Sequence, residues 1–236
     1  MKTLYKLTDR NGNTHNFVHW KVGITHSIIN QCTNPRLCSE DVFHAYKNIN
    51  LAFLLNPLHA NILNPLLWQV SGKIVVEDFG KVGCFSLKVI KRLPIPNWVH
   101  SNKKHDVQLL FTILCAEKVL YLFKNKYPND NRPQKAIEDA IKYLRLHTKN
   151  AAKDAHEAAI RAQAASTVAS TAHDIYASNA AQTAALTAFT AHATSNLIAA
   201  YAARTATAAS NADFEKKNID FGKLADSAVK MIMEQK

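Results

Sequence analysis

Residues 151–169 read AAKDAHEAAIRAQAASTVA, and this stretch decides the fold of the C-terminal half of the chain. Alanine is the strongest helix former, and the 26 alanines between residues 151 and 212 are accompanied by no glycine or proline. The alanines step by four and three residues, which places their methyl groups on one face of a long helix. We expect this stripe of small side chains to pack closely against neighbouring helices. The stripe consists of Ala151, Ala155, Ala158, Ala162, Ala165, Ala169 and Ala172.

A second stripe with helical spacing lies further toward the C-terminus. It consists of Ala177, Ala181, Ala184, Ala188, Ala191, Ile198, Ala202 and Ala206. The polar stretch over residues 170–178 separates the two stripes and favours a turn. Because disordered segments are usually rich in proline, glycine and serine, helix is favoured over low-complexity disorder. Residues 221–233 predict a last amphipathic helix.

Two further helices are expected on the N-terminal side of the first stripe. Apolar residues recur with a helical period over residues 106–126, and Asp106 is the expected N-cap. The segment YPNDNR over residues 127–132 breaks this helix. Pro133 then suits the first position of the next helix, because the N–H that proline lacks has no partner within the helix at that position.

Residues 1–104 are predicted to be rich in β-structure. Polar and apolar residues alternate over residues 3–8, and the Asn-Gly pair within residues 9–13 predicts a hairpin turn with a returning strand over residues 15–22. Residues 66–77, with a bend at Gly72, and residues 82–93 predict two longer strands.

A loop and a short helix are expected between these strands. Residues 31–39 favour a loop. Ser39-Glu40-Asp41 offers a cap for a helix over residues 41–55 that ends before Pro57. The fold class is therefore α+β: a small antiparallel β-rich N-terminal domain followed by an alanine-rich α-helical bundle. Pro94-Ile95-Pro96 and the polar residues 101–104 place the domain boundary between residues 1–104 and 105–236.

Charge is distributed unevenly along the chain. The net charge is +11, and residues 1–104 carry 13 Lys and Arg against 5 Asp and Glu, whereas residues 105–236 carry 16 against 13. A basic surface of this kind favours an anionic partner such as a nucleotide or nucleic acid, although it also serves solubility.

Several classes of protein are disfavoured. The apolar stretches over residues 49–55 and 62–70 are interrupted and shorter than the roughly 20 residues that cross a membrane. The N-terminus lacks the apolar core of a secretory signal, and the four cysteines are too dispersed for a disulfide scaffold. We therefore expect a cytoplasmic protein without a membrane partner.

Catalytic and metal-binding signatures are not found in the sequence. It contains no P-loop, G-x-G-x-x-G, G-x-S-x-G or H-E-x-x-H motif, and we assign no catalytic residue and no cofactor. Cys32, Cys38 and His44 have a C-x5-C-x5-H spacing that matches no common zinc site, so buried thiols are the favoured interpretation.

Histidines supply candidate binding residues. His44 could face a pocket from the start of the predicted short helix. His173 and His192 are bulky residues in alanine-rich surroundings, and they could face one cavity together with Tyr176 and Tyr201. That cavity would suit a small-molecule enzyme, and the alternative is hydrogen bonding of the histidines between helices.

Charged side chains supply two more candidate sets. Glu117 and Arg132 lie near the turn over residues 127–132 that joins the first two predicted helices. With Glu138 and Asp139 they form either a binding site or a set of ion pairs that fixes this turn. Lys88 and Arg92 could contact phosphates in the basic N-terminal domain. The further stacking and basic residues considered there are Tyr5, Lys6, Phe17, Trp20, Lys21 and Lys91.

Two segments resemble known families. LCSEDVFHA at residues 37–45, followed by LWQVSGKIV at residues 67–75, resembles a β-rich domain of unknown function in phage and bacterial proteins. Its pattern reads approximately L-C-x-x-G-[FL]-H-A, and this chain has Val42 in place of the glycine. CAEKVL at residues 115–120, YPNDNRP at residues 127–133 and the alanine-rich tract are similar to the alanine-rich helical putative immunity proteins.

The resemblance implies a non-catalytic binding protein that neutralises a toxin or a defence component, either as an immunity protein or as a phage anti-defence protein. A net charge of +11 departs from the acidic character of many immunity proteins. Exposed alanine stripes would also predict a homo-oligomer. The alternatives are a nucleic-acid or nucleotide binder that uses the basic domain, and an enzyme with a histidine-containing pocket.

Overall fold

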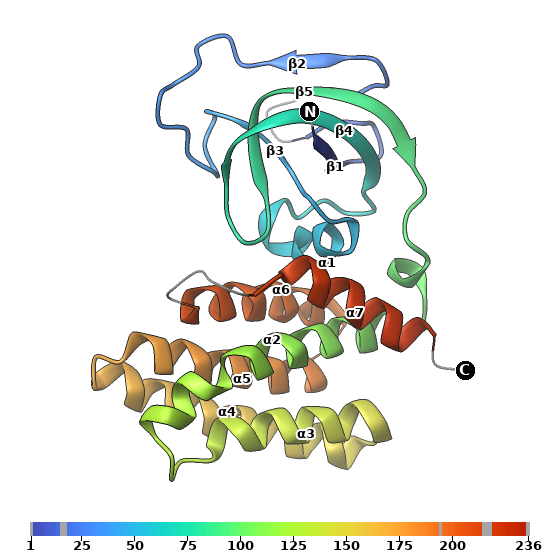
Figure 1. The fold of residues 1–236 in the computed structure, drawn as a ribbon. Helices are drawn as coiled ribbons and strands as arrows, with labels where there is room; N and C mark the ends of the chain where they lie inside the picture. Colours follow the sequence, from blue (N-terminus) through green and yellow to red (C-terminus); the bar gives the residue numbers. More distant parts are fainter. Residues whose placement is uncertain (1, 15–17, 194, 214–218, 235–236) are drawn as a thin grey trace. The chain divides into compact units, whose positions relative to one another are not determined.

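The structure is a computed structural model that describes residues 2–14, 18–193, 195–213 and 219–234. The chain divides into two compact units, residues 1–99 (the β unit) and residues 100–236 (the helical unit), shown in Figure 1. An antiparallel sheet builds the first and α-helices build the second, which confirms the predicted α+β class.

The β unit is organised around two long, paired strands. In the described residues its antiparallel sheet has the order β1-β4-β5-β2, and β3 also pairs with β5. The strands are β1 (Lys2–Thr8), β2 (Thr25–Ser27), β3 (Phe43–Ala45), β4 (Leu66–Glu77) and β5 (Val82–Leu93). The two long strands predicted from the alternation of apolar residues are thus confirmed.

The predicted bend in β4 is also present. The register between β4 and β5 shifts between Gly72 and Ile74. A Cβ atom at Gly72 would lie 2.6 Å from the main-chain oxygen of Ser86, so the close approach of the two strands requires glycine here.

The expected N-terminal hairpin is wrong, although its turn exists. Gly12 has a φ of +81°, and the Asp9 carboxylate accepts hydrogen bonds from the N–H groups of Asn11 and Asn13. The hydrogen-bonding edge of β1 is taken by the longer, more apolar β4. Of the predicted returning strand, residues 15–17 lie outside the described residues, and residues 18–22 contribute an isolated bridge between Asn13 and His19.

The helix predicted over residues 41–55 is also wrong. Residues 43–45 form β3, and α1 (Ile49–His59) begins later, where the side-chain oxygen of Asn48 accepts from the N–H of Leu51. The Asp41 carboxylate instead accepts from the N–H of Arg36 and so closes the preceding loop. α1 continues through Pro57, because a proline near the helix end removes only one helical hydrogen bond.

The β unit buries a core between β1, β4, β5 and the preceding loops. The indole N–H of the buried Trp68 donates to the hydroxyl of Thr8 over 2.8 Å, so the polar atoms of this core are paired. The core residues are Leu4, Trp20, Ala45, Trp68, Val70, Val82, Cys84, Leu87 and Val89.

The helical unit follows the 3₁₀ turn η2 (Asn97–His100). Its helices are α2 (Lys104–Lys126), α3 (Arg132–Leu146), α4 (Lys149–Thr171), α5 (Ile175–His192), α6 (Ser195–Ala212) and α7 (Phe221–Met233). Pro133 lies in the first turn of α3, and a turn separates α4 from α5, as expected. α2 begins two residues earlier than expected, so Asp106 lies in the first turn of the helix and is not the cap. In the first turn its negative charge suits the helix dipole.

The alanine stripes face the inside of the helical unit. Ala151 to Ala169 in the first stripe are at most 1% exposed, whereas Ala172 is exposed because it follows the last residue of α4. The second stripe is likewise buried, and α5 contacts α2, α3, α4 and α6. Both stripes are therefore buried by helices of the same chain. The exposed alanine face from which a homo-oligomer was predicted is not present in these stripes.

Several buried hydroxyl groups inside the helical unit donate to main-chain oxygens. The Thr187 hydroxyl of α5 donates to the main-chain oxygens of Thr183 and of Thr112 in α2. The Ser166 hydroxyl of α4 donates to the oxygen of Ser178 in α5. Small residues and these bonds hold neighbouring helices together, alongside larger apolar side chains such as Leu109, Ile113 and Ile137. Among the described residues, no helix is long and apolar enough to cross a membrane.

Candidate functional site in the β unit

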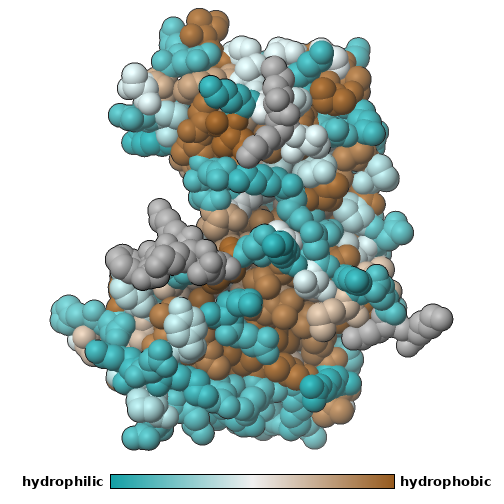
Figure 2. Space-filling model, in the orientation of Figure 1, coloured by the Kyte–Doolittle hydropathy of each residue, from teal (hydrophilic) through white to brown (hydrophobic). Residues whose placement is uncertain are grey.

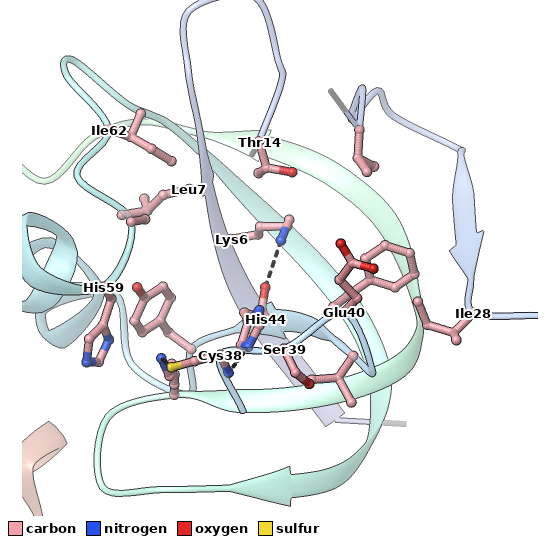
Figure 3. Close-up of a pocket in the computed structure, with 16 residues that line it drawn as sticks. Lys6, Leu7, Thr14, Ile28, Cys38, Ser39, Glu40, His44, His59 and Ile62 are labelled. Carbon is pink, nitrogen blue, oxygen red and sulfur yellow. Dashed lines mark hydrogen bonds between the residues drawn. The ribbon is translucent and has the colours of Figure 1, made fainter. Parts of the chain in front are cut away.

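The β unit contains a cavity of about 750 Å³, a size that suits a small-molecule ligand. Figure 3 shows its lining residues. Its walls come from β1, the loop before β3, β3 itself, the end of α1 and the turn between β4 and β5. Five polar side chains define its chemistry: Lys6, Cys38, His44, His59 and Lys81.

Lys81 is placed by a tight turn between β4 and β5. The Asp78 carboxylate accepts from the N–H groups of Gly80 and Lys81, at 2.8 and 2.7 Å. A side chain at Gly80 would collide with Leu55 of α1, so glycine lets the turn pack against that helix. The Lys81 side chain is only 7% exposed, and its Nζ donates to the Sγ of Cys38 over 2.7 Å.

Cys38 is held in an uncommon backbone conformation. Its φ is +61°, in the left-handed region that residues with a side chain rarely adopt. Its N–H donates to the Nε2 of His44 over 2.9 Å, so this nitrogen of His44 is an acceptor and carries no proton. Cys38 is exposed, and it lines the cavity between Lys81 and His44.

Lys6 brings a buried amine to the cavity from β1. Its Nζ donates to the main-chain oxygen of His44 over 2.8 Å and lies 4.2 Å from the centre of the Trp20 ring. Figure 3 shows the first of these contacts as a dashed line. Burial lowers the pKa of Lys6 to about 7, so neutral and charged forms are both populated at physiological pH.

The two histidines of the cavity are neutral at physiological pH. Burial, followed by repulsion from Lys81, lowers the pKa of His44 to about 4 and that of His59 to about 4. In the described part of the chain, the buried Nδ1 of His59 has no hydrogen-bond partner. This nitrogen therefore retains the capacity to bind a polar group.

These groups give the cavity a cationic and nucleophilic character. Lys6 and Lys81 supply amines, Cys38 supplies sulfur, and the carboxylate of Glu40 is the acidic group among the lining residues. No group of three or more metal-binding side chains occurs in residues 2–14, 18–193, 195–213 and 219–234. The arrangement suits an anionic ligand.

Of the residues proposed from sequence as binding residues of the N-terminal domain, the structure brings His44 and Lys6 to this cavity. Lys88 and Arg92 lie exposed on β5. Lys6 and Trp20 are buried, so they cannot meet nucleic acid from the surface as expected. Phe17 lies outside the described residues. Cys32 and Cys38 are exposed, which corrects the interpretation that they are buried thiols.

The histidines proposed for one cavity in the helical unit lie apart. His173 is in the turn before α5, and Tyr176 is in its first turn. His192 ends this helix, which has 18 residues and is therefore about 27 Å long. The His192 ring lies 4.5 Å from that of His156, and Tyr201 stacks on Phe189, so the shared pocket predicted for an enzyme is not formed.

Near the turn between α2 and α3, Arg132 and Asp139 form ion pairs, but not with the partners that were expected. Arg132 makes bidentate contacts with Asp130, and these hydrogen bonds lower the pKa of the Asp130 carboxyl. Asp139 pairs with Lys135. Glu117 is exposed on α2. An ion pair thus fixes the turn, but Glu117 does not take part.

Sequence reasoning missed the central pair of the cavity. Cys38 was weighed only as a metal ligand, and Lys81 was not considered. The two residues lie 43 positions apart, and no spacing rule connects a loop cysteine with a hairpin lysine. The turn residues around Asp78 and Gly80 were the available local signal, because they mark Lys81 as the last residue before a strand.

Comparison with known proteins identifies the helical unit. No curated protein and no solved structure matches the chain. One family matches residues 99–221, just over half of the chain, under the description Imm-5 like putative immunity protein. The match begins at the last residue of the β unit and ends at the first residue of α7. The chain therefore belongs to the Imm-5 like putative immunity protein family.

Proposed function

We propose that this protein is an immunity-type binding protein that neutralises a protein partner through its helical unit. The observation that carries the proposal is the family match, which covers the helical unit up to the first residue of α7 and leaves out the β unit except for Val99. Toxins and components of host–phage defence are the partners that such a role implies. The partner would be bound by surface side chains, because the interior of the unit is filled by its own alanine and larger apolar side chains.

A shallow groove along the outer face of α3 is the surface that suits this partner best. It has a volume of about 490 Å³ and lies within the matched residues. Leu146 is 54% exposed and Ile141 is half-buried, and together they form the apolar part of the groove. An apolar floor with a charged rim is typical of protein interfaces. The groove consists of Glu138, Ile141, Lys142, Arg145 and Leu146.

The helical unit holds this groove rigidly. Lys142 on its rim pairs with Asp154 of α4 over 2.8 Å, and Arg132 fixes the start of α3 through Asp130. Hydrophilic side chains line the edge of the helical unit where α3 lies in Figure 1, as Figure 2 shows. A preorganised surface of this kind loses little conformational entropy on binding.

The proposal is tested by a selection for genomic DNA fragments that cells tolerate only when they also express this protein. A library of genomic DNA from the source organism is transformed into cells that express the wild-type chain, and into cells that express Leu146→Asp. We expect some fragments to establish only with the wild type, and their products to bind the purified chain. Val168→Asp, at an equally exposed position on α4, is the matched control and should protect. If no fragment depends on the chain, or if Leu146→Asp protects fully, the proposal is wrong.

A second candidate function is binding of a small anionic ligand, such as a nucleotide, in the cavity of the β unit. The buried amines of Lys6 and Lys81 favour it, since a bound anion would offset the cost of burying their charge. Inorganic phosphate and a nucleoside monophosphate should raise the unfolding temperature of the β unit at low salt, and less so for Lys6→Met. Equal effects on both proteins would exclude the cavity as the binding site.

A further inference from the structure

We propose that Cys38 is the nucleophile of a covalent acyl-transfer site in the β unit cavity, with Lys81 as its proton donor and acceptor. The substrate class is a small acyl compound that carries an anionic group. This inference is independent of partner binding by the helical unit, and it deepens the second candidate function, because the cavity that binds an anion would also react with it.

The contact between Cys38 and Lys81 is the first observation. An N–H···O hydrogen bond measures about 2.9 Å, and sulfur is larger than oxygen, so a separation of 2.7 Å between Nζ and Sγ is a close contact. The thiolate is the nucleophilic form of cysteine, and an adjacent ammonium group is the kind of neighbour that stabilises it. Only 7% of the Lys81 surface is exposed, so its amine is held beside the sulfur of Cys38.

The position of Cys38 is the second observation. A left-handed backbone at a residue with a side chain costs energy, and such residues concentrate at functional sites. The hydrogen bond from its N–H to His44 secures this conformation. In Figure 3 the sulfur lies on the cavity wall between His44 and His59, where a bound molecule can reach it.

The other cysteines lack this environment. Cys32 is also exposed, but its thiol lies beside the carboxylate of Asp41 and not beside a lysine. Burial raises the pKa of Cys84 to about 11 and that of Cys115 still further. Cys32 is therefore an internal control of similar exposure.

The two half-reactions balance with the groups present and water. The Cys38 thiolate attacks the carbonyl carbon, a C–S bond forms, and the bond to the leaving group breaks. The leaving group departs with the electron pair of that bond and takes a proton from the Lys81 ammonium. Water then attacks the thioester and gives a proton to the neutral Lys81 amine. The C–S bond breaks, the thiolate returns, and the acyl group leaves as a carboxylic acid.

Lys6 accounts for the charge of the substrate. Both Lys6 and Lys81 line the cavity, where the histidines are neutral and Glu40 supplies one carboxylate. The carbonyl of His44 fixes the Lys6 amine, and the ring of the same residue fixes the Cys38 N–H. A substrate anion held by Lys6 would thus be positioned relative to the nucleophile.

Selective alkylation tests the nucleophile in the wild-type protein. The folded full chain is treated at pH 7 with a limiting amount of iodoacetamide, and peptide mass spectrometry follows the rate at each cysteine. Cys38 should react at least about tenfold faster than Cys32. Lys81→Gln should remove this difference, whereas Lys81→Arg, which keeps the charge, should retain most of it. Equal rates at Cys38 and Cys32 in the wild type overturn the proposal without reference to any variant.

Acylation tests the proton transfer. The probes are p-nitrophenyl acetate and its anionic analogue p-nitrophenyl succinate, with release of p-nitrophenol and the acyl mass on Cys38 as readouts. The anionic probe should acylate Cys38 faster, and the adduct should turn over. Lys81→Arg should accumulate the adduct, because a guanidinium does not accept the proton of water. An adduct that never turns over in the wild type, or that turns over equally in Lys81→Arg, rules out the role of Lys81.

Discussion

The Nζ of Lys6 donates a 2.8 Å hydrogen bond to the main-chain oxygen of His44, and so joins β1 to β3 across the wall of the cavity. The ring of the same histidine accepts the N–H of Cys38. One residue therefore links a buried amine to an exposed thiol. The chemistry of the β unit depends on this link, and so does its response to pH.

Lys6 should make the stability of the β unit rise with pH above neutrality. Its pKa is about 7 in the folded chain and near 10.5 when unfolded, so between these values the unfolded state binds more protons. Burying the charged Lys6 amine lowers the free energy of unfolding by at most about 5 kcal/mol below pH 7, and this loss disappears as the pH approaches 10.5. Lys6→Met should abolish this rise. Urea unfolding followed by tryptophan fluorescence measures it, because Trp20, Trp68 and Trp98 all lie in the β unit.

The cavity histidines should destabilise the β unit in acid. The pKa values of His44 and His59 are about 4 when folded and 6.5 when unfolded, so stability is complete above pH 6.5 and falls as pH decreases toward 4. Each histidine contributes at most about 3 kcal/mol, reduced by solvent screening. His44→Gln should weaken the acid dependence of the same fluorescence transition, and an unchanged dependence would contradict the assignment.

Gly80→Ala should disturb both the packing and the reactivity of the β unit. The new methyl group would collide with the buried Leu55, at a cost of about 1–3 kcal/mol for overpacking. The displaced turn would also move Lys81 away from Cys38. We expect a lower urea midpoint together with slower alkylation of Cys38, while the rate at Cys32 stays the same.

The helical unit should be intolerant of larger side chains in its alanine stripes. Ala184→Leu introduces three extra carbon atoms into a fully buried position on α5, and should cost about 1–3 kcal/mol or more. Ala164→Leu makes the same change on the exposed face of α4 and is the control. Thermal unfolding followed by the helix signal in far-ultraviolet circular dichroism should show a lower unfolding temperature for Ala184→Leu than for Ala164→Leu.

Local periodicity was sufficient to predict much of the fold. β4 and β5 follow from alternation and from a glycine that permits the close approach of strands, and the two alanine stripes follow from steps of three and four. These features depend on neighbours within a few residues. The residues of β1 pair with residues of β4 that lie 58 to 70 positions away, from Thr8↔Leu66 to Lys2↔Gly72. The choice of β4 over the expected hairpin depends on which pairing buries more apolar surface.

The candidate site was largely hidden for the same reason. His44 was identified as a residue that could face a pocket, but from a helix that proved to be β3. Lys6 and Trp20 were interpreted as surface groups for nucleic acid, yet they contact one another in the interior. Their burial is set by packing against the other strands, and residue type alone suggests exposure only for Lys6.

Binding of the partner recovered by selection tests the central claim most directly, namely that the family-matched helical unit recognises it through α3. The dissociation constant is measured for the full wild-type chain, for Leu146→Asp and for Val168→Asp. We predict at least about a tenfold loss of affinity for Leu146→Asp and an unchanged constant for Val168→Asp. Unchanged binding of Leu146→Asp, or an equal loss in both variants, would contradict the account.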